Sequence, residues 1–374
     1  MKKRKGGEGM KKRKEEQGME KGRAVTHKYR WFSTRLVVCC LLMFLVAFGS
    51  KTGQCAAQQS GADIPNYKWT AALNVAETTL NYKIVNKFKE LIAEKSGGKI
   101  VVDIYAGGKL GGDKEMMEGL IGGNIHFASA ITTILVNFVP QNAVFDLPSA
   151  LPNIKVMRAV LDSPFKAKMN TYNKKGNIMM LGYADAGFRQ MTSNKPVRSV
   201  KDISGIKIRV MQNPNHIAYW KSLGANPVAM DFGELYTALQ QGVVDAQENP
   251  YMNTVANKLY EAQKYVIETN HLGHIIIFIM NNKLYEGLPV KVRGMVDDCA
   301  KKAIDYGRSL ADDSIAADKK VITDKKVEII TLSSSDLDKM KEKAAPVYEN
   351  IRKKIGNELV DSFLAEIEKA KKQQ

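Results

Sequence analysis

Cysteine is scarce in this chain of 374 residues, which contains only four. Cys39, Cys40 and Cys55 lie within the first 57 residues, so Cys299 is the only one beyond them. A single thiol cannot form an intramolecular disulfide, and it cannot build a cysteine-rich zinc site. The folded part of the chain must therefore be held together by its hydrophobic core.

Long apolar runs are also missing. The only continuous run covers residues 36–49, which is shorter than the roughly 20 residues of a bilayer-spanning helix. It follows a basic segment with 13 Lys and Arg against four Glu in the first 35 residues, and the small residues Ala56 and Ala57 come after it. This order predicts a signal peptide over residues 1–57 that is cleaved on export to the periplasm. The alternative is an uncleaved leader that acts as a short membrane anchor.

The formal charge of +17 is concentrated in this leader. Beyond residue 57, basic residues are scattered over predicted helix faces, and no basic stripe alternates with aromatic residues. Proteins that bind nucleic acids carry such a stripe, so we expect no nucleic-acid partner. The apolar share of 44% and the charged share of 25% are ordinary for a globular protein.

The sequence contains none of the short motifs that mark common active sites. It has no Gly-x-Ser-x-Gly, no His-Glu-x-x-His and no dinucleotide-binding fingerprint after a predicted strand. Of the five histidines, only His271 and His274 are close together, and we interpret them as structural because they precede an apolar strand. We therefore expect no enzymatic activity, no cofactor and no metal.

Predicted strands and helices alternate along the chain, which is typical of an α/β fold. Strands are expected at residues 67–74, 100–105, 178–183, 206–210 and 274–280, and helices at 82–95, 113–120, 213–223 and 233–241. The run 290–320 contains no proline and keeps a helical period, which predicts a helix long enough to bridge two domains. Residues 335–371 are also expected to be helical, with a break at Pro346.

Two arginines are candidates for binding an anionic ligand. Alternation in residues 206–210 places Arg209 at the carboxyl end of a strand, and Asn213 followed by proline is expected to cap the next helix. In open α/β sheets, ligands bind at such strand ends, and helix N-termini favour anions. Arg189 precedes another short strand, residues 190–192. Two guanidinium groups that meet there would bind a carboxylate through charge-assisted hydrogen bonds, whereas the alternative is a strand arginine that faces solvent.

Several longer motifs surround these arginines in a fixed order. They are GFR at residues 187–189, GIKIRVMQNP at 205–214, LGANP at 223–227, FGELYTAL at 232–239 and VDAQENP at 244–250. Together with GGD at 111–113 and VFDLP at 144–148, these motifs resemble the substrate-binding proteins of tripartite ATP-independent periplasmic (TRAP) transporters, in their C4-dicarboxylate-binding branch. The resemblance covers essentially all of the chain after the leader.

The resemblance implies a set of ligand contacts. Arg209 corresponds to the arginine that clamps the ligand carboxylate, and Arg189 and Asn249 correspond to residues that contact the same carboxylate. Phe232 corresponds to an aromatic residue that packs against the body of the ligand. The other positions that correspond to ligand contacts are Gln212, Asn74 and, in a loop that varies with the substrate, Glu77.

The resemblance also implies two α/β domains with mixed sheets, joined by hinge strands and the long helix. We expect domain I to comprise residues 64–186 and 275–314, and domain II to comprise residues 187–274 and 315–370. Such a receptor is a monomer that buries a small organic carboxylate between its domains and delivers it to the small and large TRAP membrane subunits. The alternatives are a binding protein that serves a signalling receptor and an exported enzyme that acts on organic acids.

A charge argument addresses the class of ligand. Two arginines that bind one ligand carboxylate leave no cation for a second ligand carboxylate. If Glu77 faced the cleft, Glu77 would repel a distal carboxylate of the ligand. Ligand hydroxyl groups would instead bond to Glu77, Asn74 and Gln212. A hydroxylated monocarboxylate such as a uronic or aldonic acid is therefore expected, with a C4-dicarboxylate as the alternative if Lys83 or Lys114 supplies the cation.

Overall fold

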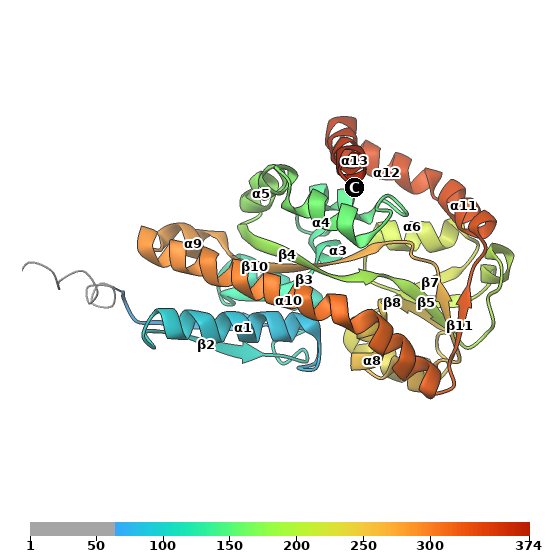
Figure 1. Ribbon diagram of the computed structural model, residues 1–374, viewed down its shortest axis with the longest axis horizontal. Helices are drawn as coiled ribbons and strands as arrows, with labels where there is room; N and C mark the ends of the chain where they lie inside the picture. The colour runs from blue at the N-terminus through green and yellow to red at the C-terminus, as the bar shows by residue number, and fades with distance from the viewer. Residues whose placement is uncertain (1–63) are drawn as a thin grey trace, which may run out of the picture. The chain divides into compact units, whose positions relative to one another are not determined.

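Two mixed β-sheets organise residues 64–374, the part of the chain that this structure, a computed structural model, describes (Figure 1). The predicted signal peptide lies outside these residues. The first sheet has the strand order β2-β1-β3-β10-β4, and the second has the order β11-β9-β5-β8-β6-β7. Because helices alternate with the strands of both sheets, the α/β class predicted from the sequence is confirmed.

The first sheet consists of β1 (Tyr67–Ala72), β2 (Ile100–Tyr105), β3 (Phe127–Ile131), β4 (Ile178–Phe188) and β10 (Gly273–Asn281). Strand β1 runs parallel to β2 and β3, and β10 runs antiparallel to β3 and β4. Ile275, Ile277 and Ile279 of β10 lie in one hydrophobic core, whereas Ile276, Phe278 and Met280 lie in another. The uniform apolar sequence of β10 thus reflects burial on both faces of the sheet.

Different helices cover the two faces of this sheet. One core contains residues of α4 (Ile154–Asp162), α5 (Phe165–Lys175) and α2 (Asp113–Gly122), and the other contains residues of α1 (Leu80–Lys95) and α10 (Val290–Asp324). The short helices α3 (Thr132–Leu135) and α9 (Asn282–Gly287) follow β3 and β10. Helix α2 follows β2, and α3 follows β3. Residues near the starts of both helices line the candidate site.

The second sheet consists of β5 (Gln190–Ser193), β6 (Lys207–Val210), β7 (Asn226–Ala229), β8 (Ala246–Asn249), β9 (Tyr265–Glu268) and β11 (Glu328–Thr331). Helices α6 (Pro214–Ser222), α7 (Leu235–Gln240) and α8 (Tyr251–Ala256) follow β6, β7 and β8. The side chain of Asn213 accepts hydrogen bonds from the first backbone N–H groups of α6, as the sequence predicted. Helix α6 therefore starts directly beyond the end of β6.

The chain passes between the sheets through two neighbouring strand connections and one long helix. Strand β4 continues into β5 through Arg189, and residues 269–272 join β9 to β10. The two connections are hydrogen-bonded, because the Arg189 N–H donates to the Leu272 carbonyl at 2.8 Å. Helix α10 packs against α1 and β4 and, further along, against α8 and β11 (Figure 1). The predicted bridging helix is confirmed.

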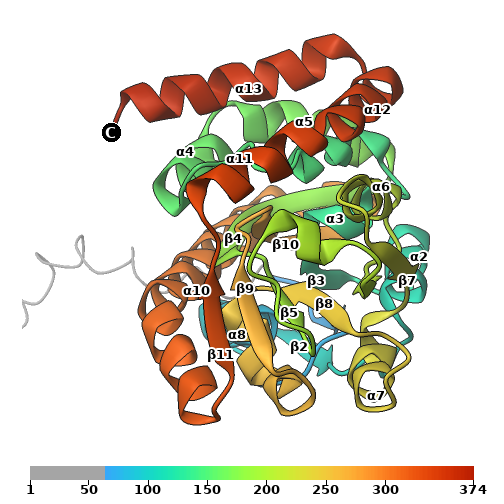
Figure 2. The same cartoon turned by 90° about the vertical axis from the view of Figure 1, so that its right-hand side faces the viewer.

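Three C-terminal helices complete the described chain. They are α11 (Ser334–Lys343), α12 (Ala345–Ile355) and α13 (Asn357–Lys372), and Pro346 lies in the first turn of α12, where the sequence predicted a break. Helix α12 packs against α6, and α13 packs against α4 and α5 (Figure 2). Within residues 64–374, no helix combines the length and the hydropathy that a membrane span requires.

Candidate ligand-binding site

A cavity of about 510 Å³ opens where segments that follow strands of both sheets meet. The first sheet contributes residues from the starts of α2 and α3, and the second contributes the end of β6 and the segment after β7. The polar side chains in its lining are Asp113, Lys114, Glu118, Thr133, Asn137, Arg209, Gln212, Asn213 and Asp231. The volume is typical of a site for a small molecule. A smaller cavity of about 40 Å³ shares Arg209 and Asp113 with it and adds Asn74, Phe232 and Asn249.

Arg209 is the buried cation of this site, with an exposed fraction of 1%. Its Nε and Nη2 atoms donate to the Met230 carbonyl at 3.0 and 2.6 Å. Its Nη1 atom is buried and has no hydrogen-bond partner among the described residues. Burial lowers the pKa of Arg209 to about 10, so the guanidinium remains charged at neutral pH. The charged guanidinium therefore has one hydrogen-bond donor that no group of the described residues satisfies.

Phe232 stands beside this guanidinium. The centre of the guanidinium lies 5.8 Å from the centroid of the Phe232 ring, within the range of a cation–π contact. Both residues line the smaller cavity. Phe232 therefore contributes an apolar surface next to the position where an anion would bind Arg209.

Arg189 occupies a different environment from the one expected. It is 2% exposed and forms a paired ion contact with Glu248, through Nε on Oε2 and through Nη2 on Oε1 at 2.9 Å. Its Nη1 atom bonds to Nδ1 of His274 at 2.7 Å. Arg189 is absent from the linings of the two cavities described above. A direct contact between Arg189 and the ligand carboxylate stays a prediction.

Glu248 is the centre of a fully buried polar cluster. His271 donates to it at 3.0 Å, and Nδ1 of His216 lies 3.7 Å from its Oε1 atom. Burial alone would raise the pKa of Glu248, but Arg189 and the two histidines hold that pKa well below its ordinary value. The structural role predicted for His271 and His274 agrees with their positions around the Arg189–Glu248 pair.

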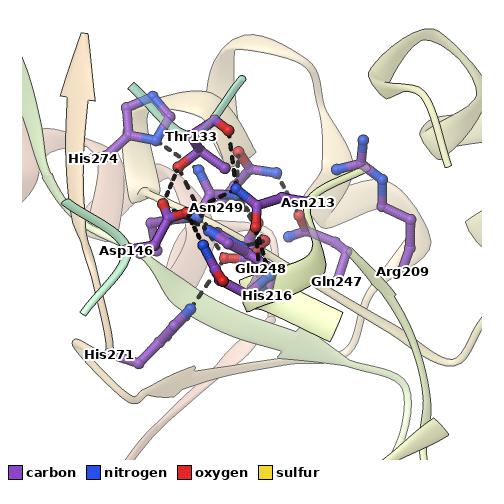
Figure 3. Close-up of polar contacts among 12 residues, drawn as sticks. Thr133, Asp146, Arg209, Asn213, His216, Gln247, Glu248, Asn249, His271 and His274 are labelled. Atoms are coloured by element: carbon purple, nitrogen blue, oxygen red, sulfur yellow. Dashed lines mark hydrogen bonds and ion pairs between the residues drawn. The ribbon is translucent and has the colours of Figure 1, made fainter. Parts of the chain in front are cut away.

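The same cluster extends to Asp146, the last residue of the short 3-10 helix Pro140–Asp146 between α3 and α4 (Figure 3). Asp146 accepts hydrogen bonds from Thr133 at 3.0 Å and from Asn213 at 2.7 Å, and it lies 3.6 Å from His216. Burial lowers the pKa of His216, but its contacts with Asp146 and Glu248 outweigh that effect and raise it. Figure 3 shows Arg209 apart from this cluster. Because Thr133 and Asn213 line the larger cavity, the cluster supports the wall of the site.

Asn249 connects the buried cluster to the smaller cavity. Its Oδ1 atom accepts a hydrogen bond from Arg189 Nη2 at 3.3 Å, and its Nδ2 atom donates to Gln247 at 2.6 Å. Asn249 lines the smaller cavity together with Arg209. The structure therefore brings Asn249, Phe232 and Arg209 together, as the resemblance implied, although their contact with a ligand stays a prediction.

Asn74 lies just beyond β1 and faces the second sheet across the cavity. Its Nδ2 atom lies 3.2 Å from each carboxylate oxygen of Asp231. Asp231 also accepts from the backbone N–H groups of Asp113 at 3.4 Å and Gly233 at 2.9 Å. The position of Asp231 is therefore fixed by donors from both sides of the site.

Asp113 is the second carboxylate of the site, at the start of α2. Burial and the nearby charge of Asp231 raise the pKa of Asp113 to about 6, against the opposing effects of Asn74 and Arg209. Sequence reasoning did not select Asp113, Asp231 or Glu248 as functional residues. Asp113 and Glu248 were nevertheless part of the quoted motifs, GGD and VDAQENP.

Glu77 and Gln212 differ in their relation to the site. Gln212 lines the larger cavity, and its backbone carbonyl accepts a hydrogen bond from Asn137 at 2.9 Å. The Glu77 side chain is 62% exposed, lies 4.0 Å from Lys109 and is absent from both linings. The charge argument that depended on Glu77 facing the cleft therefore lacks structural support. Within residues 64–374, no group of three or more His, Cys, Asp and Glu side chains is arranged to hold a metal ion.

Comparisons with known proteins identify the family of this chain. The model of the family described as bacterial extracellular solute-binding protein, family 7, matches residues 71–354. The C4-dicarboxylate-binding periplasmic protein DctP of Rhodobacter capsulatus is 30% identical over 299 residues, which cover 78% of this chain and 88% of that protein. This relative is a binding protein rather than an enzyme.

Two solved structures share the fold at similar identity. The sugar acid binding protein DctPAm from Advenella mimigardefordensis, in complex with galactonate, has a TM-score of 0.80 and 31% identity over 82% of this chain and 100% of its own. A TRAP periplasmic solute binding protein from Shewanella oneidensis with bound succinate has a TM-score of 0.76 and 26% identity, covering 81% of this chain and 100% of its own. This protein therefore belongs to the bacterial extracellular solute-binding proteins of family 7.

Proposed function

We propose that the protein is an extracytoplasmic solute receptor of a TRAP transporter, which binds a small organic carboxylate through Arg209. The observation that carries this proposal is that Arg209 lines the cavity and that its buried Nη1 atom has no partner among the described residues. A buried, unsatisfied donor is unfavourable, and a carboxylate would satisfy it with charge-assisted hydrogen bonds. The family match and the two liganded structures support the same class of ligand.

In this proposal, two domains close on the ligand, residues 64–186 with 275–314 and residues 187–274 with 315–370. The strand connections at Arg189 and at residues 269–272 are the natural hinges, because each joins one sheet directly to the other. Closure would exclude water and strengthen the contact between Arg209 and the carboxylate. The closed monomer would then deliver its ligand to the small and large membrane subunits in the periplasm, without catalysing a reaction.

A thermal-shift screen tests the binding step. Small carboxylates, including galactonate and succinate, are added to the purified protein and to an Arg209→Gln variant. At least one carboxylate should raise the melting temperature of the unchanged protein and fail to raise that of the variant. A Lys320→Gln variant serves as the control, because Lys320 is exposed on α10, lies 2.8 Å from Asp324 and is absent from both cavity linings. Equal stabilisation of the Arg209 variant would contradict the proposal.

A second experiment tests delivery. A small and a large TRAP membrane subunit from the same genome are reconstituted in vesicles, and uptake of the bound carboxylate is measured with and without the receptor. Uptake that depends on the receptor is expected. A receptor that binds its ligand but leaves uptake unchanged would instead favour a role in signalling.

A further inference from the structure

Two aspartates lie near the one buried cation of the cavity, whose lining also contains the exposed pair of Lys114 and Glu118. Arg209, Asp113 and Asp231 all line it, and the positive charge of Arg209 interacts with both acidic groups. Asp113 comes from the first sheet's side of the cavity, and Arg209 and Asp231 come from the second. A ligand held by Arg209 therefore lies next to an acidic pair contributed by both sides of the site.

The acidic pair is held in a fixed position. Asn74 Nδ2 lies 3.2 Å from both oxygens of Asp231, and Asn74 also acts to lower the pKa of Asp113. A Cβ atom at Gly112 would lie 2.8 Å from Asp231 Oδ2, so glycine at this position is what lets the carboxylate approach the start of α2. Because its other donors come from the backbone, Asp231 cannot swing away without losing several hydrogen bonds.

From this arrangement, and on the basis of the proposed function, we infer that Asp113 and Asp231 select the class of ligand. The preferred ligand has a single carboxylate, which binds Arg209, and carries hydrogen-bond donors that reach the acidic pair. A ligand with a second carboxylate at that end is disfavoured. The sequence suggested that Glu77 repels a distal ligand carboxylate, and we assign this repulsion to Asp113 and Asp231 instead.

The physical reason is repulsion between like charges. A second ligand carboxylate near Asp113 and Asp231 would place three acidic groups together in a site that closure shields from water, where like charges repel more strongly than in water. Lys114 does not remove this cost, because its exposed side chain lies 3.8 Å from Glu118. Hydroxyl and ammonium groups, in contrast, donate hydrogen bonds that carboxylates accept.

Three ligands of different chemistry test the inference by calorimetry. Galactonate presents hydroxyl groups, alanine presents an ammonium group, and succinate presents a second carboxylate. They are titrated into the unchanged protein and into Asp113→Asn and Asp231→Asn variants, which keep the side-chain shape but remove one charge. Glu234→Gln is the matched control, because Glu234 is exposed, close to Asp231 in the chain and absent from both cavity linings.

The unchanged protein should bind galactonate or alanine more tightly than succinate. Tighter binding of galactonate identifies hydroxyl groups as the donors, and tighter binding of alanine identifies an ammonium group. Each Asp→Asn variant should shift the preference toward succinate by about tenfold or more, and Glu234→Gln should not. Tighter binding of succinate by the unchanged protein would overturn the inference, and so would unchanged selectivity in both folded Asp→Asn variants. If Arg209→Gln binds carboxylates as well as the unchanged protein does, the proposed function itself fails, which is a distinct result.

Discussion

Asn74 and Asp231 join the two sides of the cavity, with Asn74 Nδ2 lying 3.2 Å from each oxygen of the Asp231 carboxylate. The residues are 157 positions apart in the chain and belong to segments that follow strands of different sheets. This contact places an acidic group within the lining of a cavity that also contains Arg209. The candidate site therefore combines a buried cation with a negative charge that is held in a fixed position.

Replacement of Arg209 with lysine tests the geometry of the clamp. Lysine keeps the positive charge but offers a point charge instead of a planar fork, so it cannot hold both the Met230 carbonyl and a carboxylate in the same way. We expect ligand binding to weaken by about 1.5–3 kcal/mol. Calorimetry with the carboxylate that stabilises the protein most gives this value. Unchanged affinity would rule out the carboxylate role of Arg209.

Replacement of Glu248 with glutamine tests the buried ion pair. The variant leaves the Arg189 charge uncompensated, with both side chains at most 2% exposed. Removal of one partner of a buried pair costs about 3–5 kcal/mol, so the free energy of unfolding should fall by this amount. Urea denaturation measures it, and Glu77→Gln, at an exposed side chain, should change stability by no more than about 0.5 kcal/mol. Similar losses in both variants would refute the assignment.

The raised pKa of Asp113 predicts a pH dependence. Burial, Asp231 and Glu115 raise this pKa to about 6, and Arg209 opposes them. A raised pKa means that the folded state binds the Asp113 proton more tightly than the unfolded state does. Protonation of Asp113 therefore stabilises the fold fully below the ordinary pKa of 3.8, and this stabilisation is lost as the pH rises through about 6. Asp113→Asn cannot ionise, so its stability relative to the unchanged protein should increase by roughly 2 kcal/mol between about pH 4 and pH 7. Urea denaturation measures the free energy of unfolding of both proteins across this pH range. Parallel curves for the unchanged protein and the variant would disprove the raised pKa of Asp113.

The leader predicts where the mature protein begins. The basic segment, the short apolar run and the small residues that follow it indicate cleavage after Ala57. Protein recovered from the periplasm should therefore begin near Gln58, which intact-mass spectrometry measures. Recovery of the full-length chain in the membrane fraction would show that the leader is retained as an anchor.

Regular periodicity made several elements predictable from the sequence. The apolar residues 274–280 lie in β10, the proline-free run from residue 290 forms α10, and Pro346 lies in the first turn of α12. Strand β8 was not predicted, because its sequence Ala-Gln-Glu-Asn carries no apolar pattern. Gln247 and Glu248 are nevertheless fully buried there, since Thr192 and Arg189 satisfy their polar groups.

The sequence by itself determined the α/β class, the order of the motifs and the position of Arg209 at the end of a strand, because these depend on local spacing. The tertiary structure decided which charges meet: it paired Arg189 with Glu248, placed Glu77 outside the cavity and brought Asp231 to Asn74 and Asp113. Such contacts depend on how two sheets pack against each other. Local spacing fixes the direction of a side chain along its own strand or helix, but it does not fix the partner that the side chain meets.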